Sequence, residues 1–104
     1  MKIKQAIRAI AMLAAAAAAG QVAHAQNAGK VRGMVATCAN CHGTDGRSVG
    51  RVPGLAGLDK VYFAQQMKDY KTGKRPGTIM PQLAKGYTDE QIEQLAAHYS
   101  ALKK

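Results

Sequence analysis

The sequence is poor in the residues with which a small protein usually builds and holds its core. Its 104 residues include one Phe, no Trp and only two cysteines. A single domain of this length buries too little apolar surface to be stable unaided, and it usually relies on a disulfide, a metal or a cofactor. We therefore expect something other than side chains to fill the centre of the fold.

The first 25 residues have the pattern of an export signal. A basic start is followed by an Ala-rich apolar stretch over residues 9–20, and Ala23-His24-Ala25 has the small-x-small form of a cleavage site. The alternative is an uncleaved membrane anchor, but the stretch is short for a span and consists mostly of weakly apolar Ala. We predict a signal peptide over residues 1–25 and one domain over residues 26–104, exported to the periplasm without membrane insertion.

The remaining chain carries helical patterns, with no convincing strand and no internal repeat. The first predicted helix covers residues 28–39, with Asn27 as its N-cap. The second covers residues 59–72 and begins with a capping Asp. The last begins at Thr88, whose T-x-x-Q pattern is that of a capping box, and its apolar stripe continues to Leu102. These patterns predict an all-α fold.

Two long segments between these helices are predicted to be irregular. Residues 43–57 contain five glycines and one proline, and residues 73–86 contain three glycines and two prolines. Glycine and proline at this density favour loops. A loop as long as the first is uncommon inside a small domain unless it wraps around something, which again indicates a bound group.

The segment Cys38-Ala39-Asn40-Cys41-His42 forms the C-x-x-C-H pattern, which is the attachment signature of c-type haem. Two thiols one helical turn apart can reach the two vinyl groups on one edge of the porphyrin. The next residue, His42, can then place its imidazole against the iron as the proximal ligand. We predict one haem c, bound covalently through Cys38 and Cys41.

Other uses of paired cysteines fit the sequence less well. A structural disulfide would use the same spacing, but a thioredoxin-like site requires a βαβ context and no strand is visible. Zinc requires four ligands, and beyond the motif itself the predicted mature chain offers only His98, which we place on the exposed side of the last helix. Iron–sulfur clusters require more cysteines than the chain has.

The sixth iron ligand has to come from the opposite face of the haem, and three methionines are candidates. Met34 lies one turn before Cys38 on the same helix, so it is badly placed to cross the ring. Met67 lies in an amphipathic helix, where packing in the core is the ordinary role. Met80 stands in the irregular loop before the last helix, from which a flexible thioether can reach the iron. We predict Met80 as the ligand, with Met67 as the alternative.

Pro53 lies in the glycine-rich loop soon after the haem motif. Its carbonyl could accept a hydrogen bond from the His42 ring nitrogen that is not bound to iron, which would fix the orientation of the ring. An ordinary loop proline is equally consistent with the local sequence.

With these residues in place, the sequence resembles a bacterial class I cytochrome c over nearly the whole predicted mature chain. The resemblance rests on residues 38–46, 53–57, 80, 87–92 and 95–99. It implies that the first and last helices cross with haem as the core and that Tyr99 packs at the crossing. It also implies attachment at Cys38 and Cys41, with His42 proximal, Met80 distal and the Pro53 carbonyl as the partner of His42.

Within this class, residues 78–90 are similar to the cytochrome subunit of flavocytochrome c sulfide dehydrogenases. The chain departs from two-haem members because it has one C-x-x-C-H motif, and Pro81 directly after Met80 departs from the general pattern. We expect a one-electron carrier, not an enzyme in its own right, with a His/Met pair that stays bound in both oxidation states. We consider three hypotheses for its role. It is a free electron shuttle, a subunit of a flavoprotein dehydrogenase, or a gas sensor whose iron has an open sixth position.

Acidic side chains are scarce, with 6 Asp and Glu against 15 Lys and Arg, of which 12 remain after residue 25. A basic protein can bind nucleic acid, anionic lipid or an acidic protein. Export, and the lack of an arginine-rich tract or aromatic ladder, argue against nucleic acid. We expect redox partner proteins with an acidic docking surface, although lysines scattered for solubility would produce the same composition.

Overall fold

The computed structural model describes residues 2–104, and the chain divides into two compact units, residues 1–30 and residues 31–104. Two parts of the predicted signal peptide lie outside the described residues, namely Met1 and the side chain of Ala23 in the expected cleavage site.

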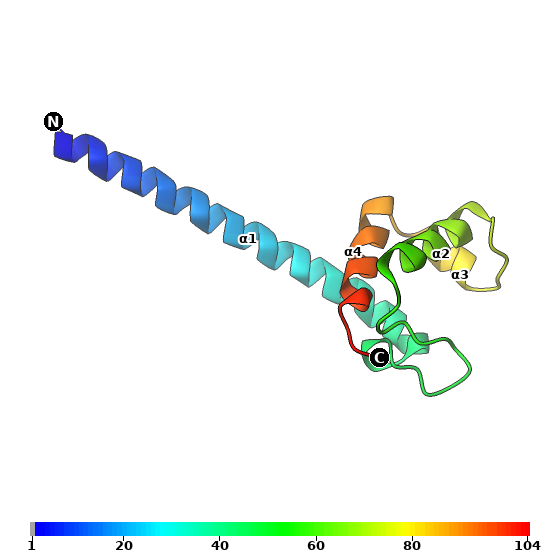
Figure 1. Cartoon of the computed structure of the whole chain (residues 1–104). Helices are drawn as coiled ribbons and strands as arrows, with labels where there is room; N and C mark the ends of the chain where they lie inside the picture. Colours follow the sequence, from blue (N-terminus) through cyan, green and yellow to red (C-terminus); the bar gives the residue numbers. More distant parts are fainter. Residues whose placement is uncertain (1) are drawn as a thin grey trace. The chain divides into compact units, whose positions relative to one another are not determined.

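The first unit consists of the N-terminal part of helix α1, which runs over Lys2–His42 (Figure 1). The prediction that this helix starts at residue 28 is wrong, and Asn27 lies inside it and does not cap it. Alanine has the highest helix propensity and no proline interrupts the segment, so the alanine-rich stretch continues the helix. By length and composition α1 could cross a membrane, and a signal sequence near the N-terminus meets the same criterion.

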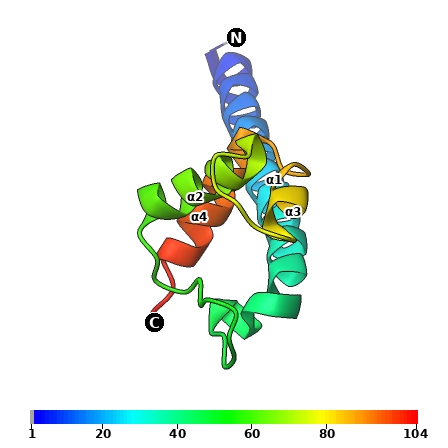
Figure 2. The same ribbon diagram turned by 90° about the vertical axis from the view of Figure 1, so that its right-hand side faces the viewer.

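The second unit combines the last turns of α1 with three further helices, α2 (Lys60–Thr72), α3 (Met80–Ala84) and α4 (Asp89–Ser100). A short 3₁₀ turn, η1 (Thr44–Gly46), follows α1. Helix α2 packs against both α3 and α4 (Figures 1 and 2). No strand occurs between residues 2 and 104, so the predicted all-α fold is confirmed.

The core of this unit forms where α2 and α4 meet the end of α1. Tyr99 and Leu95 of α4 are fully buried, and Phe63 of α2 stacks on Tyr99 with ring centroids 5.6 Å apart. Met34 and Val35 of α1 pack against this cluster. The first and last helices of the domain therefore meet at Tyr99, as the resemblance implied.

The ends of α2 and α4 are where local sequence predicts them. Asp59 caps α2 by accepting a hydrogen bond from the backbone N–H of Tyr62 at 2.9 Å, and Gly73 ends the helix in the left-handed region with φ of 84°. Thr88 and Gln91 form the expected capping box at the start of α4. Helix α4 ends at Ser100, two residues before the predicted end at Leu102.

The segment predicted as one irregular loop over residues 73–86 contains helix α3, so that prediction is partly wrong. Pro81 lies in the first turn of α3, where the N–H that proline lacks would have no helical partner. Ala84, at the other end of α3, is fully buried. The proline that looked like a loop residue therefore starts a helix, and the burial of Ala84 anchors that helix to the core.

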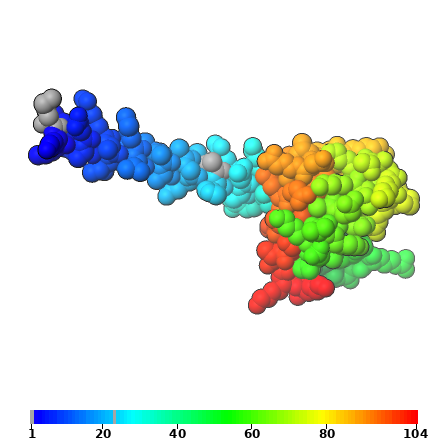
Figure 3. Space-filling model, turned by 45° about the horizontal axis from the view of Figure 1, so that its top comes forward, coloured from blue at the N-terminus to red at the C-terminus, as the bar shows by residue number. Residues whose placement is uncertain are grey.

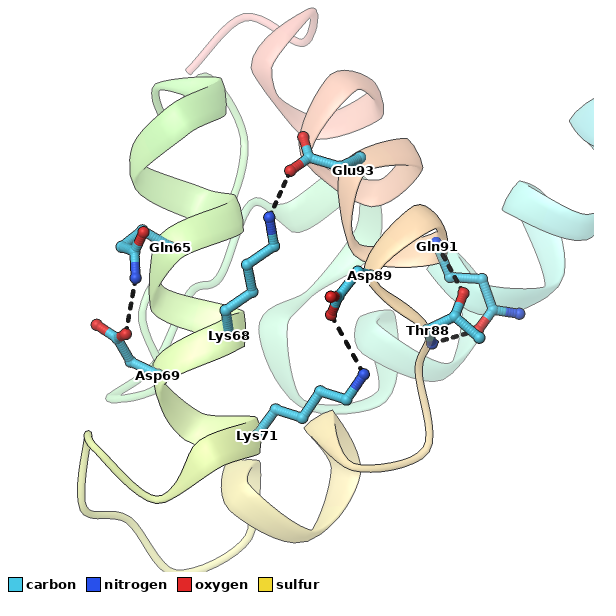
Figure 4. A network of polar contacts seen from close by, with 8 residues as sticks. All are labelled: Gln65, Lys68, Asp69, Lys71, Thr88, Asp89, Gln91 and Glu93. Atoms are coloured by element: carbon cyan, nitrogen blue, oxygen red, sulfur yellow. Dashed lines mark hydrogen bonds and ion pairs between the residues drawn. The ribbon is translucent and has the colours of Figure 1, made fainter.

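Two ion pairs join the outer faces of α2 and α4 (Figure 4). Lys68 Nζ lies 2.8 Å from Glu93 Oε1, and Lys71 Nζ lies 3.3 Å from Asp89 Oδ1. The hydrogen bond to Glu93 raises the pKa of Lys68. These pairs are largely exposed, so they contribute to the charge pattern of this face more than to stability.

The loop over residues 43–58 is tied to the end of the chain. The guanidinium of Arg47 donates a hydrogen bond to the Lys103 carbonyl at 2.9 Å, and the Gly57 N–H donates to the Tyr99 carbonyl at 2.9 Å. Between these ties the loop near residue 50, green in Figure 3, projects from the surface of the unit. Val49 at this projection is fully exposed.

Candidate haem-binding site

A cavity of about 360 Å³ opens within the second unit. It lies between the end of α1, the loop over residues 43–58, the inner face of α2, and α3. Its size is within the range of pockets for small molecules and cofactors. Six of the residues singled out in the sequence line this one cavity, and they include two of the three methionine candidates: Cys38, Cys41, His42, Pro53, Met67 and Met80.

The two cysteines lie on the last turn of α1, three residues apart, so their side chains share one face of the helix. Both thiols are free, with Cys41 exposed and Cys38 partly buried. Burial raises the pKa of Cys38, and contact with the Tyr99 hydroxyl offsets part of the shift. Two free sulfurs on one face at the edge of a cavity are what attachment of a planar group by two thioethers requires.

His42, the last residue of α1, is oriented by the loop that follows it. Its Nδ1 lies 2.6 Å from the carbonyl oxygen of Pro53. Because a carbonyl can only accept, Nδ1 carries the proton, which leaves Nε2 as the nitrogen with a free lone pair. The hydrogen bond expected from the sequence is thus present, whereas the role of His42 as an iron ligand stays a prediction.

Gly46 closes the loop that brings Pro53 back to His42. Its carbonyl accepts hydrogen bonds from the N–H groups of Leu55 at 2.8 Å and Ala56 at 3.2 Å. Gly46 has φ of 70°, and a Cβ at this position would lie 2.9 Å from both the Ala56 nitrogen and Cε1 of Tyr99. Only glycine fits here without displacing the core, so this position determines how the loop folds.

The methionines differ in burial and position. Met80 begins α3 and is partly buried, whereas Met67 in the middle of α2 is 6% exposed and belongs to the core. Met34 packs against the core and does not line the cavity. The structure thus separates Met34 from the site but leaves both Met67 and Met80 in its wall.

His98 does not lie where the sequence analysis placed it. Its side chain is partly buried, and its Nε2 is buried with no hydrogen-bond partner among the described residues. Its ring meets the buried Tyr99 ring edge-on with centroids 5.1 Å apart, so His98 lies at the border of the packed face of α4. His98 does not line the cavity.

The cavity wall fits a mostly apolar group. Four large apolar side chains of this wall remain 39–59% exposed, and these are Val52, Tyr62, Ile79 and Leu83. Apolar surface gathered in one place marks a binding site. Over the part of the chain that the structure describes, no three His, Cys, Asp or Glu side chains form a cluster that could hold a metal ion.

Three polar residues of the cavity wall are Gln66, Tyr70 and Arg75, and of these only Tyr70 was predicted from the sequence to share a face with Phe63 and Met67. Gln66 follows Phe63 at helical spacing, so the same periodicity could have placed it on the inner face of α2. Arg75 lies in the loop between α2 and α3, and no local pattern indicates its position.

Comparison with known proteins decides the family. Residues 27–103 match the sequence profile of the family described as cytochrome c. The chain belongs to the cytochrome c family. This family membership establishes covalently bound haem c as the cofactor and electron transfer as the role, and it agrees with the all-α fold.

Individual relatives of this cytochrome c are bacterial. The chain is 41% identical over 68 residues to the cytochrome subunit of sulfide dehydrogenase of Chlorobaculum tepidum. The aligned region covers 65% of this chain and 62% of that protein. It is 38% identical to cytochrome c-554(548) of Halomonas halodenitrificans, over 64% of this chain and 86% of the relative. These names are those of cytochromes and not of catalytic subunits.

Among solved structures, the cytochrome c4 of Acidithiobacillus ferrooxidans matches with a TM-score of 0.61 and 42% sequence identity. A cytochrome c4 from Pseudomonas stutzeri matches with a TM-score of 0.57 and 31% identity. The matches cover 62% and 64% of this cytochrome c, but only 38% of each cytochrome c4 chain. The chain thus spans well under half of those proteins.

Proposed function

We propose that this cytochrome c is a periplasmic one-electron carrier, with haem attached through Cys38 and Cys41 and iron ligated by His42 and Met80. The observation that carries the proposal is that these four residues, three at the end of α1 and one at the start of α3, line one apolar cavity. Bound haem iron supplies the one-electron chemistry by cycling between the ferrous and ferric states. The residues of the chain hold it, orient its ligands and keep water away.

On the proximal side, the Pro53 carbonyl orients His42. With Nδ1 held as a donor to this carbonyl, Nε2 is the nitrogen available to the metal, and the ring cannot rotate without breaking the hydrogen bond. A carbonyl partner also increases the basicity of the ligand. Because the loop that carries Pro53 is closed at Gly46, this orientation is built into the fold.

On the distal side, Met80 is the better ligand candidate because of its place in the chain. It begins a five-residue helix directly after the loop over residues 73–79, and it is only partly buried. Met67 is held in the core beside Phe63, so its thioether already has a packing role. A His/Met pair in an apolar cavity favours the ferrous state more than two histidines would.

The charge distribution supports an acidic redox partner. Four of the six acidic residues lie on α2 and α4: Asp69, Asp89, Glu90 and Glu93. The two loops beside the cavity instead carry Arg47, Arg51, Lys74 and Arg75 against Asp45. The cavity is therefore flanked by positive charge, which attracts a negatively charged docking surface to the side where the cofactor is nearest.

A second candidate function is that of the electron-accepting cytochrome subunit of a flavoprotein dehydrogenase that acts on sulfide. It is favoured by the 41% identity to the Chlorobaculum tepidum subunit and by the similarity over residues 78–90. Purification from the native host separates the two candidates. A flavin that co-elutes with the haem absorbance at fixed ratio supports the subunit, and haem alone supports the shuttle.

The periplasmic location rests on the basic, Ala-rich N-terminal segment, in which every described side chain of residues 2–30 is exposed. A helix with no packing partner in its own unit is what a removable export signal provides. The intact mass of the coloured protein tests this point together with attachment. We expect the mass of residues 26–104 plus one haem, and a colourless product with the mass of bare polypeptide would refute the proposal.

The iron ligand is tested by a pair of matched variants. Ferric haem with a methionine sulfur ligand has a weak absorption band at the red end of the visible spectrum. Met80→Ala should abolish this band, whereas Met67→Ala should keep it. Met67→Ala should instead lower stability by about 2–5 kcal/mol, because it removes a buried core side chain.

The opposite result, with the band lost in Met67→Ala and kept in Met80→Ala, would overturn the assignment. A wild-type protein that lacks the band and binds carbon monoxide readily would indicate an open sixth position, as in a gas sensor. The absorption band and the binding of carbon monoxide are both measured on the purified holoprotein, and neither measurement requires the redox partner to be identified.

A further inference from the structure

Among the residues that the structure describes, Arg75 is the one permanently charged side chain in the wall of the cavity. The others that line it are apolar or neutral and polar, apart from His42 and the two cysteines, and no Lys, Asp or Glu is among them. Arg75 is partly buried, although it lies in a loop whose neighbours on both sides, Lys74 and Pro76, are exposed. A cation held in an apolar wall pays a desolvation cost that an anion nearby would offset.

The guanidinium is held in place from two sides. Its carbon lies 4.8 Å from the centroid of the Tyr70 ring, a distance typical of a cation–π contact. One of its nitrogens donates a hydrogen bond to Oε1 of Gln66. Both partners come from the inner face of α2, and the backbone N–H of Arg75 donates to the Asp69 carbonyl at 3.0 Å. These contacts fix the side chain along the cavity wall.

No carboxylate within residues 2–104 neutralises this charge. The three ion pairs recorded over the described residues belong to Arg47, Lys68 and Lys71. A guanidinium has five N–H donors in a planar fork that matches a carboxylate, and Gln66 accepts only one of them. Arg75 is thus preorganised for an anion that this part of the chain does not supply.

We propose that Arg75 binds a propionate carboxylate of the haem, with Gln66 and Tyr70 as its positioning residues. The haem carries its two propionates on one edge, and its other edges are apolar. Because Arg75 is the one cation in the apolar wall among the described residues, the propionate edge should point toward the loop over residues 73–79. This inference rests on the haem attachment proposed above. It adds a second fixed point on the haem, besides the thioethers, and it places a positive charge where it favours the reduced iron.

The first test uses the unaltered holoprotein. In NMR spectra of the ferrous form, the Arg75 guanidinium and δ protons should show nuclear Overhauser contacts with the propionate methylene protons. The guanidinium protons should also exchange slowly with solvent. Contacts of the propionates with other residues and none with Arg75 would overturn the proposal, and this result does not depend on any variant folding.

The second test compares midpoint potentials of Arg75→Gln, Arg75→Lys and the control Lys74→Gln. Lys74 is the exposed neighbour with the same charge and is not in the cavity wall. We expect Arg75→Gln to shift the one-electron exchange equilibrium toward the ferric form by about tenfold, which is about 59 mV for one electron. Arg75→Lys should recover part of the shift, and Lys74→Gln should cause less than a third of it.

Equal shifts in Arg75→Gln and Lys74→Gln would overturn the proposal, because they would mean that only the net charge matters. Loss of haem from all the proteins, the wild type included, would instead refute the attachment at Cys38 and Cys41. The two failures are therefore distinguishable by the colour of the wild-type protein.

Discussion

Replacing Gly46 with alanine should destabilise the domain more than any glycine-to-alanine change in the loop over residues 47–56. Alanine at φ of 70° costs about 1–2 kcal/mol, because its Cβ approaches its own carbonyl oxygen. The added Cβ would also lie 2.9 Å from the Ala56 nitrogen and from Cε1 of the buried Tyr99. Relieving such overpacking costs about 1–3 kcal/mol more. The expected total of about 2–5 kcal/mol is a large part of the stability of a small domain.

The assay is guanidinium denaturation of the ferric holoprotein, followed by far-UV circular dichroism. With a slope of about 3 kcal/mol per molar, the midpoint of Gly46→Ala should fall by about 1 M. The control is Gly50→Ala in the same loop, because Gly50 has no positive φ and a Cβ added there would have no atom within 4 Å. Gly50→Ala should change stability by less than about 1 kcal/mol, with either sign. Equal midpoints for the two variants would refute the role assigned to Gly46.

Two further predictions concern α4. Thr88→Ala should remove the capping box and lower stability by about 1 kcal/mol, whereas Thr88→Ser should keep it, as denaturant midpoints of the two variants will show. Burial raises the pKa of Tyr99. Above about pH 10 the unfolded state releases the Tyr99 proton, whereas the folded state keeps it. The free energy of unfolding should therefore fall as the pH rises past that value. Tyr99→Phe should be close to wild type at pH 7, because the hydroxyl makes no well-formed hydrogen bond within the described part of the chain and its contact with the Cys38 sulfur is weak. This variant should lose less stability at pH 11 in the same titration. An identical loss of stability at pH 11 in the wild type and in Tyr99→Phe would contradict the assignment of this pH dependence to Tyr99.

Much of the domain could be predicted because its signals are local. Asp59 and Thr88 cap their helices through hydrogen bonds to residues three positions ahead, so a short window of sequence contains both partners. The cavity residues of the haem motif are likewise specified by spacing within one helical turn. Family membership then supports the cofactor that the motif indicated.

The features that were missed depend on contacts between distant segments. Helix α3 forms because Ala84 packs in the core, although its sequence contains a proline that is typical of loops. His98 is partly buried beside the Tyr99 ring, at the border of the packed face, which the apolar stripe of α4 does not reveal. Arg75 reaches the cavity only because α2 supplies an aromatic ring and an amide to hold it.

The ties between the loop after the haem motif and the last residues of the chain have a consequence for assembly. The bonds from Arg47 to Lys103 and from Gly57 to Tyr99 join positions 56 and 42 residues apart. The cysteines and His42 leave the ribosome before Tyr99 and Lys103, so this wall of their pocket cannot be secured until those two residues have followed. The contacts that hold this loop against the rest of the domain therefore form only after residues 99–103 have been made.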